Sequence, residues 1–362
     1  MDALFNARKI RYEILDRITY SYTVSKRIEK INLFINLDDM LHALHRPIIE
    51  AESTATDSST VLRLASNMLN LAAHYRGWAL RKNMDADIFM VFTSCISGSF
   101  RNEIYDMRYR DYYKSLFGQI GEKYPHINTE IPKALGIACS ISKYIEHVYI
   151  IDSRSLEPSS IPYYISSMHP SNWNLYITRD PYDLQYAEFS DWAILYPDGD
   201  NSSMITSANL WKFVCAKENI AQQNDIVLDP ALYRFSIALT GNRYRGIPRI
   251  RRCGWKSLYK IFTETIGGGE RSPAQLYIEA FRKLKPNAVD TDEMNNALDM
   301  SSVEIQAKSF HEVDCANIDT QIVDIPDYEN LITVSRCYFS KYPLSSFLID
   351  KQNKPASIFK LT

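Results

Sequence analysis

The sequence predicts an α/β fold built around a mainly parallel β-sheet. Between residues 31 and 220, short apolar runs typical of buried strands alternate with segments that have helical periodicity. Polar residues follow several of these runs, and the carboxyl ends of parallel strands are where such sheets hold their sites. A chain of 362 residues can also bury a large core and divide into two or more lobes. We therefore expect a sheet flanked by helices, with further lobes attached to it.

The expected strands and helices are spread along most of the chain. The strands are predicted at residues 31–36, 88–92, 147–152, 173–178 and 192–197. Helices are predicted at residues 58–82, 131–146, 207–219 and 274–284, and within a basic N-terminal segment, 1–30. The helix at 58–82 is the clearest, because its apolar residues recur at spacings of three and four.

These elements suggest four units along the chain. They are an N-terminal helical extension (1–30), an α/β domain (31–225), a helix–loop–helix subdomain (226–285) and a C-terminal extension of short strands and turns (286–362). No apolar run approaches the roughly 18 residues of a membrane span, and the N-terminal segment lacks the apolar region of a signal peptide. The six cysteines contain no Cys-x-x-Cys pair, which favours reduced thiols. We expect a cytoplasmic protein with no membrane partner.

A dense basic cluster lies in residues 228–262, which have the pattern of two helices joined by a loop. Between residues 242 and 260 there are seven basic side chains and no acidic one, although the whole chain has a net charge of −2. They are Arg243, Arg245, Arg249, Arg251, Arg252, Lys256 and Lys260. Such a cluster is typical of contact with a phosphate backbone. A solvated basic loop would have the same composition, and the sequence leaves both interpretations open.

A second basic segment follows the second predicted strand. Arg101, Arg108 and Lys114 are interleaved there with several tyrosines. This pattern suits single-stranded nucleic acid, whose bases stack on aromatic rings while its phosphates pair with cations. An amphipathic helix that covers the core with its tyrosines would have the same pattern.

Two acids follow the fourth predicted strand. Asp180 and Asp183 lie three residues apart, immediately after a buried run. A pair of this kind can bind a cation. The local alternative is structural, because Asp180 precedes Pro181 as a helix N-cap would, and Asp183 then lies in the first turn, where the helix dipole favours an acid.

Three stretches, in this order, resemble the motifs of a known family. The first is NLFINLDDMLHAL, with VFTSCISGSFRNEIY at the next strand; the second is LEPSSIPYYI followed by LYITRDPYDLQYAEFSDWAILYP; the third is ALTGNRYRGIPRIRRCGWKSLYKI. They resemble the structure-specific 5′ nucleases, the flap-endonuclease superfamily that includes the phage 5′ exonucleases. The resemblance covers residues 31–262. It implies a PIN-like sheet domain followed by a helix–three-turn–helix that binds DNA.

The resemblance also implies a chemistry. These nucleases hydrolyse phosphodiesters with two Mg²⁺ or Mn²⁺ ions held by a cluster of carboxylates. Glu157, Asp180 and Asp183 match acidic positions of the family motifs, and Asp38 matches if the first motif shifts by two residues. These four are the residual catalytic candidates, and the first three are the candidate metal ligands.

Four other positions at which the family carries an acid have lost it. They are Asn36, Thr93, Ser159 and Ser160. Mg²⁺ is held by oxygen ligands, several of them anionic in such a site, and a hydroxyl group brings no charge. We therefore expect nuclease chemistry to be lost or badly weakened, with Mg²⁺ or Mn²⁺ bound weakly or not at all.

The third motif implies a hairpin loop that offers backbone amides to duplex phosphate, with a monovalent cation bridging the two. The chain keeps Gly-Ile-Pro at 246–248 and Lys256, but Arg249 and Arg252 stand where the first two hairpin glycines would be. Arginine forms charge-assisted pairs with phosphate directly. The arginines could therefore take the place of the bridging cation.

Three hypotheses follow for the function. The leading one is a catalytically impaired relative of the 5′ nucleases that binds DNA as duplex, flap or junction, or RNA, in a replication, repair or transcription assembly. The second is an active, divergent metal-dependent 5′ nuclease of the exonuclease, flap-endonuclease or RNase H type. The third is a protein-interaction module that reuses the fold, with its 24 tyrosines and its C-terminal third contributing to the interface. For a viral protein, the expected location is the host cytoplasm.

Overall fold

The computed structural model describes most of the predicted core of the chain. The described residues are 30–37, 58–81, 84–92, 147–152, 158–168, 172–197, 202–222, 226–242, 249–250, 253–266 and 271–285, with isolated positions at 134, 137–138, 142, 170, 247, 294–295, 298–299 and 302. The predicted N-terminal helical extension lies almost entirely outside these residues, as do most of the helix predicted at 131–146 and of the C-terminal extension.

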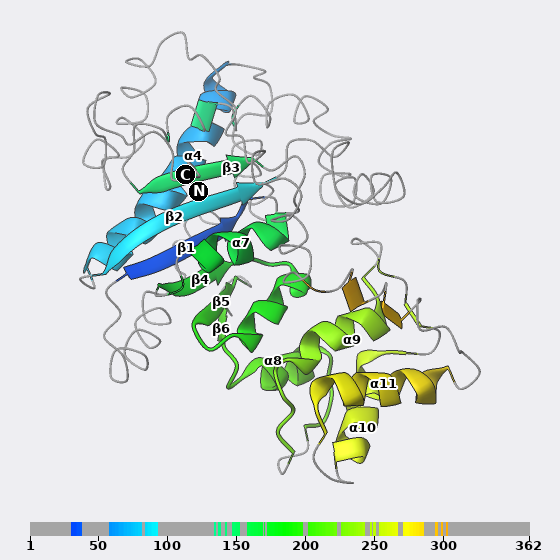
Figure 1. The fold of residues 1–362 in the computed structure, drawn as a ribbon. Coiled ribbons are helices and arrows are strands. Elements are labelled where there is room, and N and C mark those ends of the chain that lie inside the picture. Colours follow the sequence, from blue (N-terminus) through cyan, green and yellow to red (C-terminus); the bar gives the residue numbers. More distant parts are fainter. Residues whose placement is uncertain are drawn as a thin grey trace.

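Six strands form one sheet in the spatial order β3-β2-β1-β4-β5-β6 (Figure 1). They are β1 (Lys30–Asn36), β2 (Asp85–Phe92), β3 (Val148–Asp152), β4 (Trp173–Ile177), β5 (Trp192–Tyr196) and β6 (Ser203–Ile205). The first five are parallel to their neighbours, and β6 runs antiparallel to β5. The predicted α/β class with a mainly parallel sheet is confirmed. The sequence missed β6, because three residues are too few to establish a period.

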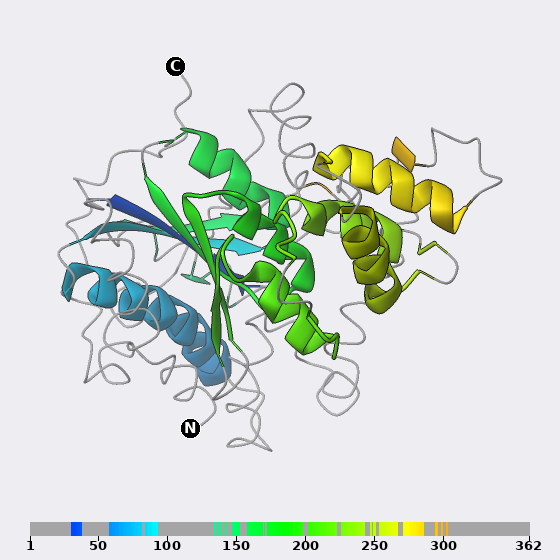
Figure 2. The same cartoon turned by 90° about the horizontal axis from the view of Figure 1, so that it is seen from below.

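Helices flank the sheet and extend past one end of it. They are α4 (Ser58–Arg81), α7 (Ile161–Met168), α8 (Leu210–Lys217), α9 (Leu232–Thr240), α10 (Trp255–Ile266) and α11 (Pro273–Leu284), with the 3₁₀ segments η2 (Pro158–Ser160) and η3 (Pro181–Glu188). Helix α4 covers one face of the sheet and α7 lies on the other, while α9, α10 and α11 gather beyond the β6 end (Figures 1 and 2). Within the described part of the chain, no helix combines the length and the hydropathy of a membrane span.

An aromatic row crosses the face of the sheet on which α7 lies. The parallel register places Phe34 of β1 opposite Phe89 of β2 and Tyr176 of β4, and Tyr149 of β3 continues the row. Phe34 stacks on Phe89 with ring centroids 5.2 Å apart, and on Trp192 of β5 at 5.5 Å. A central strand of a parallel sheet is buried on both faces, so its sequence is almost continuously apolar. The stacking of Phe34 on its neighbours stabilises the observed register of β1 at the centre of the sheet.

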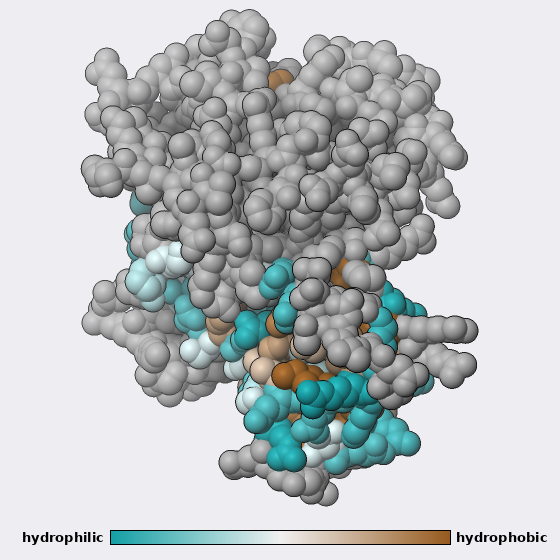
Figure 3. All heavy atoms as spheres, turned by 45° about the vertical axis from the view of Figure 1, so that its right-hand side comes forward, coloured by the Kyte–Doolittle hydropathy of each residue, from teal (hydrophilic) through white to brown (hydrophobic). Residues whose placement is uncertain are grey.

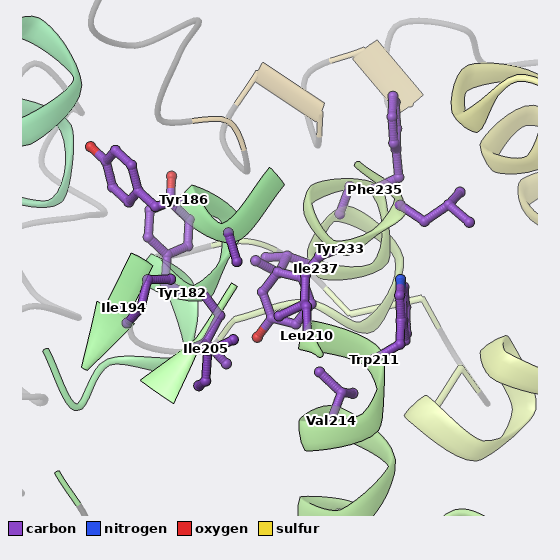
Figure 4. Packing of buried hydrophobic residues seen from close by; sticks show 14 of the residues in the cluster. Tyr182, Tyr186, Ile194, Ile205, Leu210, Trp211, Val214, Tyr233, Phe235 and Ile237 are labelled. Atoms are coloured by element: carbon purple, nitrogen blue, oxygen red, sulfur yellow. The ribbon is translucent and has the colours of Figure 1, made fainter. Parts of the chain in front are cut away.

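The same buried cluster continues from the sheet into the helices beyond it. Tyr233 and Ile237 of α9 lie together with Leu210 of α8 and Tyr182 of η3 (Figure 4). The helical subdomain predicted at 226–285 is thus packed onto the sheet domain through apolar side chains. Its helices α9, α10 and α11 are positioned by that packing.

One helix start differs from the expected one. The dipeptide Asp229-Pro230 predicts a cap followed by a helix, but α9 begins at Leu232 and its N-cap is Ala231, without a side-chain cap. The Asp229 carboxylate instead accepts a hydrogen bond from the amide of Ala231 at 2.9 Å, which forms a turn two residues ahead of the helix. Aspartate favours both a cap and such a turn, so the sequence alone does not separate them.

Candidate functional site

The candidate site lies where the strand order of the sheet reverses. The chain proceeds from β1 outward to β2 and β3, and then returns to place β4 on the other side of β1. The crevice beyond the carboxyl ends of two such strands is the usual ligand site of an open α/β sheet. Asn36 is the last residue of β1, and Thr178 follows directly after β4. Both side chains are buried.

Asp183 joins these two residues. The Thr178 hydroxyl donates to Oδ2 of Asp183 at 2.6 Å, and the Asn36 amide donates to the same oxygen at 3.3 Å. The Asp183 residue has no exposed surface. A buried carboxylate is costly unless donors satisfy it, and here neutral donors from two strand ends stabilise one of its two oxygens, Oδ2. The structure thus brings together Asn36 and Asp183, which the sequence had assigned to two separate motifs.

The local structure of the η3 turn accounts for the position of Asp180. Its carboxylate accepts a hydrogen bond from the amide of Tyr182 at 2.9 Å, and Pro181 occupies the first position of the turn. The Asp180 amide in turn donates to the Thr178 hydroxyl at 3.1 Å. The capping role that the sequence left open is confirmed for Asp180, and Asp183 does lie in the first turn.

The η2 segment carries Ser159 and Ser160, both completely buried. It is tied to η3 by Tyr186, whose hydroxyl donates to the Ser159 carbonyl at 2.7 Å and accepts from the Tyr163 amide at 2.9 Å. Burial, and secondarily the charge of Asp183, raises the pKa of Tyr186 well above its usual value. The phenol therefore stays protonated and keeps its bond to η2. Tyr186 was not singled out from the sequence, because one tyrosine among 24 gives no signal.

Several predicted site residues lie outside the described residues. They are Asp38, Thr93, Glu157, Arg101, Arg108, Lys114, Arg243, Arg245, Arg251 and Arg252. Among the residues that the structure describes, no three Asp, Glu, His or Cys side chains are grouped so as to hold a metal ion. Asp180 caps η3, and the Oδ2 atom of Asp183 accepts hydrogen bonds from neutral donors, so these two described acids do not by themselves provide the several anionic oxygens of a two-metal centre.

Helix α9 is attached to η3 near both ends of that turn. The Tyr233 hydroxyl donates to the Pro181 carbonyl at 2.7 Å, and Arg234 pairs with Glu188 at 3.4 Å. Burial is the first cause of the strongly raised pKa of Tyr233, followed by the charge of Asp180. The first helix of the predicted helix–three-turn–helix is therefore in direct contact with the turn that carries the acids.

The loop between α9 and α10 is closed by short-range contacts. Gly241 has φ 74°, and a Cβ at this position would lie 2.6 Å from the Arg249 amide nitrogen. Asn242 and Ile247 exchange two backbone hydrogen bonds of 3.0 Å. The resemblance suggests phosphate contact for Arg249, and in the structure the Nε of this residue donates to the Cys253 carbonyl at 2.7 Å. Arg249 thus takes part in folding the loop.

Beyond the loop, the basic residues of α10 face outward. Lys256 and Lys260 are both exposed and, four positions apart, share one face of the helix. Lys260 pairs with Glu264 at 3.7 Å, and the side chains of the two are 75% and 57% exposed. An ion pair this exposed contributes little to stability, so Lys260 can exchange its partner readily.

Comparison with known proteins gives no relative from which a function could be taken. No protein-family model matches the chain, and no curated protein matches it significantly.

Proposed function

We propose that this protein binds nucleic acid through α9, the following loop and α10, and that it is impaired as a nuclease. The proposed ligand is DNA as duplex, flap or junction, or RNA, within a replication, repair or transcription assembly. The observation that carries the proposal is the state of Asp183, whose oxygen accepts hydrogen bonds from Asn36 and Thr178 at the place where a nuclease would present carboxylates to metal. Helix α9, which precedes the basic loop and α10, is attached to the same turn through Tyr233.

The proposed loss of nuclease activity follows from the hydrogen-bond donors around Asp183. A carboxylate that binds Mg²⁺ must offer its oxygens to the ion, and the ion requires several such oxygens together. At the end of β1 an amide occupies the position that would need an acid, and its N–H group donates a hydrogen bond where a carboxylate would offer oxygen lone pairs to the ion. Both neutral donors bond the same oxygen of Asp183, Oδ2, and one carboxylate does not carry the negative charge that a pair of divalent ions needs.

The binding function follows from charge and exposure. Lys256 and Lys260 extend from a helix whose position is fixed by packing, and the loop before it is closed by Gly241 and Arg249. Binding to a phosphate backbone gains free energy from counterion release with each cation that contacts it. Rigid placement of the helix that carries these lysines reduces the entropy lost on binding.

The binding function can be tested by fluorescence anisotropy with a labelled duplex over a range of salt concentrations. We expect Lys256→Ala together with Lys260→Ala to lower the slope of log K against log salt by about two, because each phosphate contact contributes about 0.9. Lys212→Ala, at an exposed position of α8, is the control and should leave the slope unchanged. Equal salt slopes for the wild type, the double variant and the Lys212→Ala control would contradict the proposal.

The impaired chemistry can be tested separately. A labelled flap substrate is incubated with the wild-type protein and Mg²⁺ or Mn²⁺, and the products are resolved on a denaturing gel. We expect binding without cleavage. Cleavage that disappears in Asp180→Ala would instead establish the active, divergent nuclease, since that change removes a carboxylate in the matching motif.

A further inference from the structure

A pocket opens where the start of α9, the end of α10 and the start of α11 come together. It has a volume of about 440 Å³, and its lining residues come from the segment 227–232, from Ile266 and from the segment 271–276. The exposed lysines of α10, Lys256 and Lys260, do not line it. The pocket is therefore a feature of the helical subdomain that the proposed function does not explain.

The inner wall of the pocket is apolar, and one apolar residue stands at its rim. Leu232 and Leu276 are buried, and Ile266 packs against the same core. Val227, however, is 90% exposed, and among the described residues only Leu80 of α4 is another exposed large hydrophobic residue, at 45%. An apolar patch surrounded by hydrophilic side chains is visible on the described part of the subdomain in Figure 3. A single exposed valine is ordinary on a protein surface, but this one borders a pocket with apolar walls, and an apolar ligand would cover both.

Contacts within the described chain hold the pocket in shape. The Trp211 indole donates to the Asp229 carbonyl at 2.9 Å, and the Asp229 carboxylate accepts from the Ala231 amide at 2.9 Å. At the start of α11, Ser272 and Gln275 form a capping box, in which each side chain bonds to the backbone of the other. A site that is already formed needs little ordering when a ligand arrives, and so more of the contact energy remains as affinity.

The charges at the rim favour a cation. Arg271 donates to Glu279 at 3.1 Å, so its charge is already balanced by an acid of α11. Asp229 is exposed, and none of the ion pairs among the described residues includes it. The turn before α9 accounts for a carbonyl-type acceptor at this position, but an asparagine would form the same turn without a charge. The unbalanced charge at the pocket is therefore negative.

The openness of the pocket distinguishes between two kinds of ligand. Sites for small molecules typically enclose 70–90% of the ligand surface. Here the rim residues Val227, Asp229, Arg271 and Ser272 are all exposed, so a small molecule would remain largely in contact with water. A side chain that projects from a longer chain loses nothing by this, because its backbone stays outside and contacts the rim.

We propose that this pocket binds a segment of a partner protein in which a bulky apolar side chain is followed by a lysine or an arginine. The apolar side chain lies against Leu232, Ile266 and Leu276 and covers Val227. The cation of the next residue pairs with Asp229. This inference does not depend on nucleic-acid binding, since the pocket and the lysines of α10 have no residue in common.

The probe is a capped, fluorescein-labelled hexapeptide with tryptophan followed by lysine at its centre, and a second peptide has glutamate in place of the lysine. Fluorescence anisotropy measures the binding of each to the full chain at low salt. Val227→Ser removes the apolar rim, and Leu80→Ser makes a comparable change on α4 as the control. Asp229→Asn removes the charge and keeps the oxygen that accepts from Ala231. Urea unfolding of each variant checks that the fold is kept.

We expect the wild-type protein to prefer the lysine peptide about fivefold, the upper range for an exposed ion pair, and Asp229→Asn to lose this preference. Val227→Ser should weaken binding at least about fourfold, the value for one buried methylene group, while Leu80→Ser stays near wild type.

The inference is overturned if neither peptide binds the wild-type protein, if the preference for lysine survives in Asp229→Asn, or if the Val227 and Leu80 variants behave alike. Tryptamine carries an indole and an amine without a peptide chain. If it displaces the labelled lysine peptide as effectively as the unlabelled peptide does, the site takes a small amine and the assignment to a protein partner is wrong. Each of these outcomes leaves the proposed function standing, because the salt dependence of duplex binding is measured separately.

Discussion

The strand-end site and the α10 surface use polar side chains in opposite ways. At the strand ends, Asp183 is completely buried, and its Oδ2 atom accepts hydrogen bonds from Asn36 and Thr178. On α10, the Lys260 side chain is 75% exposed and its ion pair is loose. A buried polar group is committed to the partners that the fold provides, because leaving it unsatisfied is costly. An exposed cation remains available to whatever arrives from solution.

The two regions are nevertheless connected. Tyr233 of α9 bonds to the first residue of the η3 turn, and Arg234 pairs with Glu188 at its end. The strand-end site and η3 therefore help to position α9, and through it the exposed surface of α10. The comparison teaches that a buried polar cluster can hold a neighbouring helix whose exposed side chains remain available to a ligand. Substitutions in the strand-end site should accordingly change the free energy of unfolding, and substitutions on α10 should change nucleic-acid binding.

The largest effect is expected from Asn36→Asp, which would place a second carboxylate against Asp183. Two buried acids at this distance repel, and an uncompensated buried charge costs about 3 to 5 kcal/mol. We expect the free energy of unfolding to fall by that amount at neutral pH. Mg²⁺ or Mn²⁺ should restore part of it, because an ion that binds only the folded state stabilises it.

The matched control is Asn32→Asp, at the amino end of the same strand. Asn32 is also buried and hydrogen-bonded to Asn174 and Asn172. A charge there should destabilise the protein as well, but without recovery by metal. Thermal unfolding with and without the ion measures both. Equal recovery in the two variants would mean that the strand-end position has no special relation to metal.

Gly241→Ala should have the next largest effect. Its backbone, at φ 74° and ψ 163°, is in a region that essentially only glycine adopts, and the added Cβ would meet the Arg249 backbone at 2.6 Å. We expect a loss of about 2 to 3 kcal/mol in urea unfolding. Gly254→Ala is the control, because its Cβ would meet only the flexible end of the Arg249 side chain, at 3.3 Å. Similar losses in both would contradict this account of the loop.

Two tyrosine variants should separate the links that join η3 to its neighbours. Tyr186→Phe leaves the Ser159 carbonyl and the Tyr163 amide without their partner, while Tyr233→Phe affects only the Pro181 carbonyl. We expect losses of about 2 and about 1 kcal/mol respectively in urea unfolding. The Tyr233 variant should also weaken nucleic-acid binding slightly, since α10 is positioned through α9. The reverse order of stabilities would show that the hydroxyl contacts are not the main links.

The smallest effect on stability is expected on the exposed surface. Lys256→Ala should change the free energy of unfolding by less than about 0.5 kcal/mol, as is usual for exposed positions. Its effect should appear only in the salt dependence of binding to a duplex. A loss above 1 kcal/mol would show that this lysine supports the fold, and the contrast between the two regions would then fail at this residue.

Local sequence was sufficient for the α/β class and the five parallel strands. Each depends on residues close together in the chain, such as an apolar run, so its signal survives without tertiary context. The sequence offered the cap at Asp180 as one of two alternatives, and the hydrogen bond from the Tyr182 amide decided between them. The described residues leave the PIN-like interpretation and the nucleic-acid function as proposals, because these depend on groups that no local pattern can place together.

Only the tertiary structure decided which groups meet. Asn36 and Asp183 are 147 residues apart, and their contact exists because the strand order places β4 beside β1. The short strand β6 and the bond from Tyr233 to η3 arise in the same way. A periodic pattern reports which face of an element is buried, but the partner across the interface depends on how the whole chain packs. For this protein, the residue types were determined by the sequence, and their pairing was decided by the fold.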